Sequence, residues 1–158
     1  MRKTTFLKKL EEIEIIIKKC QTCHVAMVDQ YGKPYLLPFN FGYDDGVVYL
    51  HSDQTGKKID ILKNNPAVCI NFSKDHDLFM ANDHVACSYG MAYRSVLVYG
   101  NVEFITENDK KIEALNIFMK QYVDRDFSYA EPSVKNVCIF KVKIEDFTGK
   151  MYHHENLE

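Results

Sequence analysis

The sequence has little of what marks disordered, fibrous or membrane-spanning chains. It contains only 4 prolines and 7 glycines in 158 residues, which excludes a collagen-like or low-complexity chain. Its longest purely aliphatic run is Ile15-Ile16-Ile17, set among glutamates and lysines, so we expect neither a transmembrane helix nor a secretory signal. The formal net charge is only -2, and no basic stripe is present, so we expect no nucleic-acid or membrane partner.

The content of the chain is that of a compact protein. Hydrophobic residues make up 46% of the sequence, enough for one domain over residues 1–158 with a substantial core. We find no repeat or linker that would divide it. The cysteines are odd in number and no export signal accompanies them, so we expect a cytoplasmic protein with free, mostly buried thiols. These cysteines are Cys20, Cys23, Cys69, Cys87 and Cys138.

The first half of the chain predicts one helix followed by a meander and a second, short helix. Apolar residues at helical spacing indicate an amphipathic helix from Thr5 to Lys19. Three β-type runs follow, separated by turns: His24 to Val28, Tyr35 to Phe41 and Val47 to His51. A short helix from about Gly56 to Asn64 should end before Pro66.

The second half predicts further strands around one more helix. We expect a strand from Ala67 to Phe72, an irregular segment from Ser73 to Met91, a long strand from Tyr93 to Ile105 bent at Gly100, and a last strand from Val137 to Ile144. Between the last two strands, a helix should be capped by residues 106–109 and bury a stripe of Ile112, Leu115, Met119 and Tyr122. Since no βαβ alternation appears, we predict a mainly β protein with peripheral helices and an antiparallel barrel.

Residues 49–58 are the segment best suited to chemistry. A strand ends in His51 and Ser52, Gly56 opens a helix, and Lys57 and Lys58 lie in its first turn. Unpaired helix amides, hydroxyl groups and lysine charge together suit a phosphate. The pattern is not a Walker loop, because histidine stands where that loop needs its first glycine. The competing interpretation is a solvated turn with surface lysines.

Several soft motifs follow one another in a fixed order along the chain. They are Leu37-Pro38-Phe39-Asn40-Phe41-Gly42-Tyr43, Val48-Tyr49-Leu50-His51-Ser52, Gly56-Lys57-Lys58, Asn65-Pro66-Ala67-Val68-Cys69 and Tyr93-Arg94-Ser95-Val96-Leu97-Val98-Tyr99-Gly100. Together they resemble the nitroimidazole-reductase-like branch of the pyridoxamine 5'-phosphate oxidase superfamily, the FMN-binding split barrels. The similarity covers roughly Lys19 to Lys143.

The resemblance implies an antiparallel split β-barrel that forms a homodimer, with FMN at the subunit interface. The phosphate would lie near His51, Ser52, Lys57 and Lys58. The ring would lie along the strand that holds Pro38, Phe39 and Asn40, and the cleft would be lined by Tyr93, Arg94 and Ser95. From the residues alone, Asn40 could instead form a turn, Tyr93 could be a packed aromatic, and Arg94 could pair with an acid on the sheet.

The function implied is an FMN-dependent oxidoreductase that passes electrons from a nicotinamide or another donor to a small aromatic or nitro-type acceptor. The flavin would carry the electrons, so no protein acid or base is obligatory and we assign no catalytic residue. The alternatives are an FMN-binding module without turnover and a haem-binding or haem-degrading split barrel. In the last case the iron ligands would come from His51, His76, His84, His153 or His154.

Two cysteine patterns compete with the flavin interpretation. Residues 20–24 match the C-x-x-C-H pattern of c-type haem attachment, but that chemistry needs export, so we interpret the match as chance. Zinc could be drawn from Cys20, Cys23, His84 and Cys87, although Cys87 has the apolar neighbours of a core cysteine, and we expect no metal site. A redox role for Cys20 and Cys23 would require a lowered thiol pKa.

Overall fold

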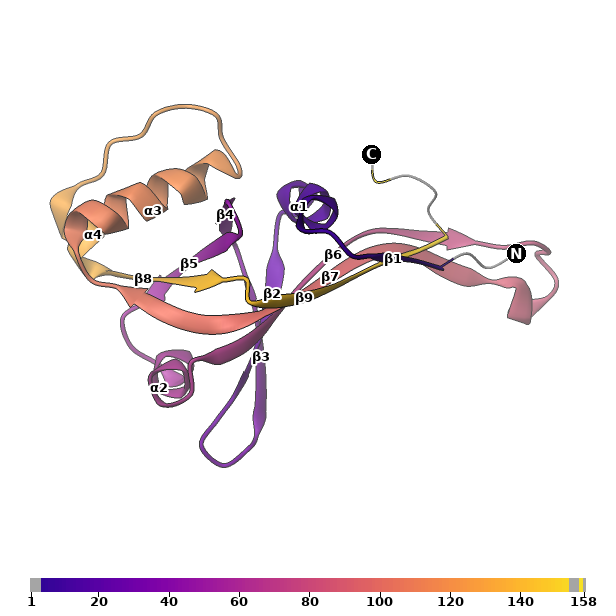
Figure 1. The fold of residues 1–158 in the computed structure, drawn as a ribbon, viewed down its shortest axis with the longest axis horizontal. Coiled ribbons are helices and arrows are strands. Elements are labelled where there is room, and N and C mark those ends of the chain that lie inside the picture. The colour runs from indigo at the N-terminus through magenta and orange to yellow at the C-terminus, as the bar shows by residue number, and fades with distance from the viewer. Residues whose placement is uncertain (1–3, 154–156, 158) are drawn as a thin grey trace.

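The computed structural model describes residues 4–153 and 157, and shows an antiparallel sheet curled into an open barrel with a long arm (Figure 1). Within these residues the strands are β1 (Thr4–Leu7), β2 (Cys23–Val28), β3 (Pro34–Phe39), β4 (Gly42–Asp44), β5 (Val47–Asp53), β6 (Ala67–Phe79), β7 (Gly90–Ile105), β8 (Val137–Lys143) and β9 (Asp146–Tyr152). The α-helices are α1 (Leu10–Lys19), α2 (Lys57–Asn64), α3 (Asn108–Lys120) and α4 (Glu131–Asn136). Of the helices described, none has the length and apolar character to span a membrane.

The strands follow the order β3-β2-β6-β7-β8-β5-β4, and β9 pairs with both β7 and β1. Every pairing is antiparallel, which confirms the predicted mainly β architecture with peripheral helices. β7 changes partner along its length, pairing with β9 up to Tyr99 and with β8 from Val102. Gly100 lies at this change, where a Cβ would collide with the carbonyl oxygen of Lys143.

The core lies inside the barrel and beneath α1. Ile13, Ile16 and Ile17 of α1 are fully buried against the sheet, as the helical spacing predicted for Ile13 and Ile17. Inside the barrel, the rings of Phe41 and Phe72 meet edge to face with centroids 4.9 Å apart. Burial of such large apolar side chains supplies the main driving force for folding.

The prediction of a helix starting at Thr5 was wrong. The first residues form β1, which pairs with β9, and the Phe6 side chain is 67% exposed rather than part of a helical stripe. The Glu12 carboxylate accepts hydrogen bonds from the backbone amides of Lys8 and Lys9, at 2.8 and 3.0 Å. These bonds satisfy donors at the start of α1, so the helix begins only at Leu10.

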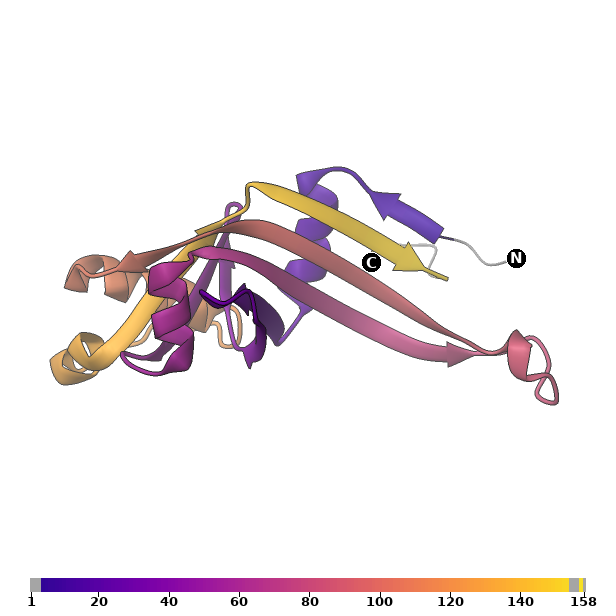
Figure 2. The same ribbon diagram turned by 90° about the horizontal axis from the view of Figure 1, so that it is seen from below.

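The prediction of an irregular segment from Ser73 to Met91 was correct only for its middle, residues 80–89, which hold one short 3-10 helix at Ala86–Ser88. β6 continues to Phe79 and β7 begins at Gly90, so the two strands form an arm that extends away from the barrel (Figures 1 and 2). A bulge between Lys74 and Asp77 interrupts the alternation by which the strand could have been recognised.

Three further elements, β4, β9 and α4, and one helix face were missed, and the strand expected up to Phe41 ends at Phe39. β9 follows the strand predicted to be the last, and its Gly149 lies directly under α1 and β1, where a Cβ would be 2.7 Å from the Cβ of Leu7. α4 was not predicted. On α3 the predicted stripe was wrong, because the buried side chains are Lys111, Ala114 and Phe118. This face of α3 packs on β4 and β5.

Candidate functional site

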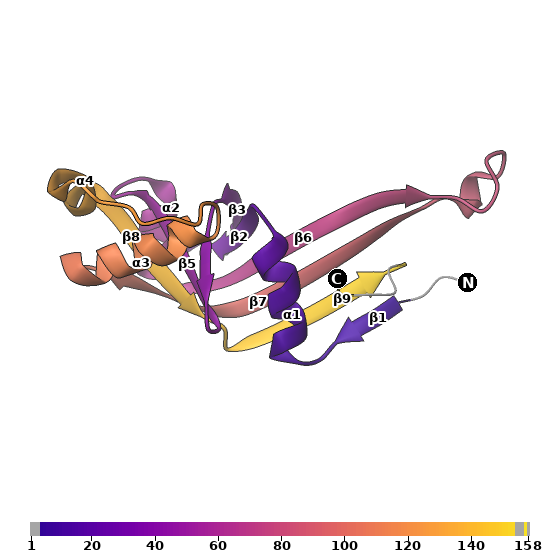
Figure 3. The same cartoon turned by 90° about the horizontal axis from the view of Figure 1, so that it is seen from above.

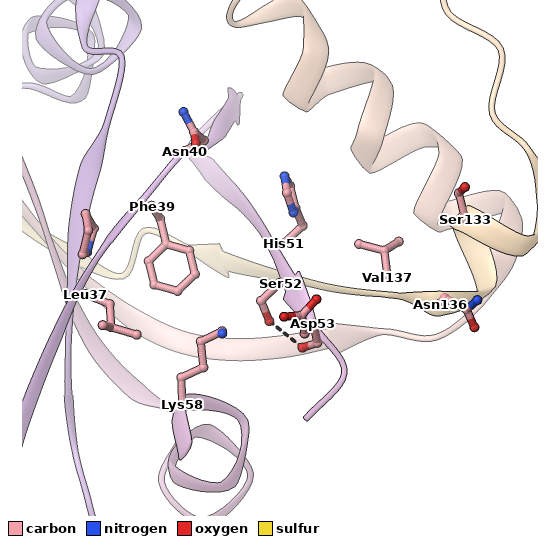
Figure 4. Close-up of a pocket in the computed structure, with 11 residues that line it drawn as sticks. Leu37, Phe39, Asn40, His51, Ser52, Asp53, Lys58, Ser133, Asn136 and Val137 are labelled. Carbon is pink, nitrogen blue, oxygen red and sulfur yellow. Dashed lines mark hydrogen bonds between the residues drawn. The ribbon is translucent and has the colours of Figure 1, made fainter. Parts of the chain in front are cut away.

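A cleft of about 610 Å³ opens between β3, the end of β5, α2 and α4 (Figure 4). Its lining comes from two regions of the chain that are distant in sequence, residues 37–58 and 133–137. The lining residues are Leu37, Pro38, Phe39 and Asn40 on the β3 side, His51, Ser52 and Asp53 on β5, Lys58 on α2, and Ser133, Asn136 and Val137 at α4 and the start of β8.

The end of the cleft beside α2 is the end suited to an anion. Gly56, at a φ of +115°, starts the helix, and within the described residues no side chain caps its first turn. The amine of Lys58 projects into the cleft between the β3 and β5 walls (Figure 4). The Ser52 hydroxyl lies opposite and donates a 2.8 Å hydrogen bond to the carbonyl oxygen of Asp53. A helix N-terminus, a cation and a hydroxyl group therefore meet at one place.

The two adjacent lysines face different surfaces. Lys58 lines the cleft, whereas the ammonium group of Lys57 lies 4.7 Å from the ring centroid of Tyr35. Lys57 also borders a separate, smaller depression that includes Asp29 and Asp60. The structure thus brings Lys58 together with His51 and Ser52, and does not bring Lys57 there.

His51 forms the middle of the β5 wall. Its ring meets the ring of Phe118 edge to face, with centroids 4.5 Å apart. The His51 ring is desolvated where it lies beside Phe118 of α3. This desolvation lowers the His51 pKa below its ordinary value of 6.5, so the neutral imidazole predominates at neutral pH. At that pH the side chain offers one hydrogen-bond donor and one acceptor to a ligand rather than a charge.

The α4 wall depends on a buried lysine that the sequence did not reveal. Lys111 is only 7% exposed, and its ammonium group donates hydrogen bonds to the carbonyl oxygens of Val134 at 3.2 Å and Val137 at 2.8 Å. The Gln54 side chain also donates a 2.6 Å hydrogen bond to the carbonyl oxygen of Lys135, which ties the end of β5 to α4. These bonds fix the wall that carries Ser133, Asn136 and Val137, which sequence reasoning missed.

Tyr93, Arg94 and Ser95 lie on β7, outside this cleft. The Arg94 guanidinium pairs with the Asp75 carboxylate, as the alternative interpretation of that residue proposed. The Ser95 hydroxyl accepts a 3.2 Å hydrogen bond from the Asn71 amide. The Tyr93 ring lies near Tyr152 and beneath the ammonium group of Lys150, 5.5 Å from the centroid.

The cysteine patterns form no site among the described residues. Cys20 and Cys23 are buried, and burial raises their pKa values to about 11 and about 12, so both thiols stay protonated at neutral pH. His84 and Cys87 lie at the tip of the arm instead, and Cys87 is exposed, contrary to the expectation of a core cysteine. No group of three metal-ligating side chains that could hold an ion occurs within residues 4–153 and 157. His154 lies outside the described residues.

A family described as "Pyridoxamine 5'-phosphate oxidase" matches residues 9–151. Among solved structures, a candidate 5-nitroimidazole antibiotic resistance protein from Bacteroides thetaiotaomicron is 40% identical, with a TM-score of 0.85 over 96% of this chain and 89% of that one. None of the curated proteins matches the chain significantly.

Two more distant structures share the fold. The flavocytochrome Anf3 from Azotobacter vinelandii is 21% identical, with a TM-score of 0.80 over 92% of this chain and 68% of that one. The FAD and heme binding protein from Mycobacterium smegmatis is 15% identical, with a TM-score of 0.84 over 94% of this chain and 74% of that one. At these identities the similarity concerns the arrangement of the strands and helices.

Replacing Lys111 by Met should destabilise the protein, because the two carbonyl oxygens lose their donor while the apolar stem is retained. We expect the free energy of unfolding to fall by about 1–3 kcal/mol, measured by urea denaturation. The matched control is Lys110→Met, one residue away, where the exposed lysine pairs with Glu107 on the surface. The control should change stability by less than about 0.5 kcal/mol. Equal effects of the two substitutions would contradict the role of Lys111.

Proposed function

Because the chain belongs to the pyridoxamine 5'-phosphate oxidase family, whose split-barrel fold it shares, we propose that it binds FMN in this cleft and acts as an FMN-dependent oxidoreductase. The observation that carries the proposal is the meeting of Lys58, Ser52 and His51 at the start of α2, opposite the apolar wall of β3. A volume of about 610 Å³ falls within the usual range for small-molecule sites, about 300–1,000 Å³.

The phosphate would be held at the α2 end. Lys58 supplies a charge-assisted donor, and the first amides of α2 supply the positive end of the helix dipole. The Ser52 hydroxyl and the His51 imidazole add neutral hydrogen-bonding groups at the same edge. The carboxylate of Asp53 also lines the cleft and repels an anion, so the phosphate would lie on the Lys58 side.

The flat ring would lie farther along the cleft. Leu37, Phe39 and Val137 offer apolar surface, which suits a planar aromatic group. Asn40 and Asn136 offer amide donors and acceptors on opposite sides, which suit the polar edge of a flavin ring. Pro38 adds a rigid wall with no backbone donor. The residues present therefore fit FMN in both charge and shape.

Electron transfer is the chemistry that a bound flavin supplies, and the chain would bind it, orient it and shield it from water. We propose a small aromatic or nitro-type acceptor, with a nicotinamide or another electron donor. The relative that is 40% identical, described as a candidate 5-nitroimidazole antibiotic resistance protein, supports this class of acceptor. NADH or NADPH oxidation stimulated by a nitroimidazole would test it, and no stimulation with any nitroaromatic acceptor would contradict it.

We further propose that the protein is a homodimer in which each copy completes the cleft of the other. The arm exposes apolar side chains: Leu78 is 68% and Met80 56% exposed. Such surface on a projecting arm indicates a protein partner. Tyr93, Arg94 and Ser95 lie at the base of the arm and would line the partner's cleft.

Charges on the arm should disrupt this dimer. Leu78 and Met91 are cross-strand partners, so the double variant Leu78→Glu/Met91→Glu places two carboxylates on one apolar patch. We expect the mass measured by light scattering to fall from two chains to one, and FMN to be released. The control Tyr31→Glu changes an 85% exposed residue in the β2–β3 turn and should stay dimeric. A wild-type mass of one chain would contradict the proposal.

Lys58→Ala should weaken FMN binding by about 10- to 100-fold, because it removes a charge-assisted hydrogen bond of about 1.5–3 kcal/mol. Riboflavin lacks the phosphate, so its affinity should be nearly unchanged. The matched control is Lys57→Ala, which removes the same charge from the neighbouring residue and should change FMN affinity by less than about threefold. Titration followed by flavin fluorescence measures both ligands. Equal losses in the two variants would contradict the assignment of Lys58.

A further inference from the structure

Asn40 and Phe41 connect two strands without belonging to either. β3 ends at Phe39 and β4 begins at Gly42, so the peptide between Asn40 and Phe41 lies outside both strands. Phe41 is fully buried, and its amide therefore needs a partner within the protein. That partner comes from the turn that follows α3, in a part of the chain 81 residues away.

The partner is the hydroxyl group of Tyr122. It accepts a 2.9 Å hydrogen bond from the Phe41 amide and donates a 2.8 Å hydrogen bond to the carbonyl oxygen of Gln21. A phenol has one proton to donate, and the Gln21 carbonyl takes it, so the direction of both bonds is determined. Because the Phe41 N–H and the Asn40 carbonyl share one planar peptide, the two bonds also fix the backbone orientation of Asn40.

α3 packs closely on β4, directly after the Asn40–Phe41 peptide, and on β5. A Cβ on Gly42 would lie 2.7 Å from the backbone nitrogen of Phe118, so only glycine allows this close approach of β4 and the helix. The Phe118 ring contacts both Tyr122, at 5.7 Å between centroids, and His51, at 4.5 Å. Figure 3 shows α3 lying over β5 beside β4. α3 and the turn after it thus contact both the peptide that follows Asn40 and the ring of His51.

We propose that Tyr122 is a positioning residue for the flavin ring, acting through Asn40. The inference rests on the proposed FMN site, since Asn40 is the residue that would contact the ring. The Tyr122 hydroxyl fixes the peptide between Asn40 and Phe41, and so the backbone position from which the Asn40 side chain lines the cleft. Removal of the Tyr122 hydroxyl alters the hydrogen bonds to the edge of the flavin ring and leaves the phosphate end at Lys58 unchanged.

The test is Tyr122→Phe, which keeps the ring contact with Phe118 and removes only the hydroxyl. We expect FMN and riboflavin to bind about tenfold more weakly, and to the same extent. The reason is that loss of the Tyr122 hydroxyl displaces Asn40, which would contact the flavin ring that both ligands share. We also expect a displaced visible absorption maximum and a changed reduction potential of the bound flavin. The matched control is Tyr129→Phe, whose exposed hydroxyl bonds to Asn116 of α3 at 3.1 Å and should leave all four quantities unchanged.

A second variant distinguishes loss of the Asn40 contact from loss of the fold. Asn40→Ala should reproduce the displaced absorption maximum, and the double variant Tyr122→Phe/Asn40→Ala should add little to it, because both changes act on the same contact. Wild-type flavin spectra and affinities in Tyr122→Phe, or full additivity in the double variant, would overturn the inference alone. A wild-type protein that binds no flavin would overturn the proposed function with it.

Discussion

The change of partner along β7 is the constraint on which the rest of the structure depends. One strand of 16 residues pairs with β9 before Gly100 and with β8 after it, and the glycine allows the backbone of the strand to approach Lys143 closely. After this point β8 and β5 close one side of the barrel that carries the cleft. Before it, β6 and β7 run together past their pairing with β2 into the arm (Figure 2). A side chain at Gly100 would therefore disturb both halves at once.

The cleft follows from that arrangement. Pairing of β5 with β8 sets Ser52 opposite Cys138 and Asp53 opposite Val137, so the end of β5 lies beside the entry to β8 from α4. α2 then begins a few residues beyond β5 and turns Lys58 back toward it. α3 fixes the remaining geometry through Lys111 on the α4 side and Tyr122 on the β3 side. The lining residues lie in loops and at the ends of strands and helices, and the sheet beneath fixes their relative positions.

The local chemistry of the cleft was accessible from the sequence, whereas its long-range parts were not. A strand ending in His-Ser and a glycine opening a helix are local patterns, so His51, Ser52 and Lys58 could be brought together by reasoning. The sequence could not show which of Lys57 and Lys58 faces the cleft. That depends on the rotation of α2 about its axis and on the contact of Lys57 with the ring of Tyr35. The burial of Lys111 could not be recognised, since its partners are backbone carbonyls 23 and 26 residues away. The arm was hidden by its bulge, and β1 by apolar residues that also fit a helical stripe.

The visible absorption spectrum of the purified protein tests most directly whether the cleft holds FMN. We expect flavin bands, with one FMN per chain released into the supernatant on denaturation. For protein purified without its cofactor, we expect that added FMN restores the bands. A colourless protein that FMN titration cannot turn yellow, or a Soret band from bound haem, would contradict it.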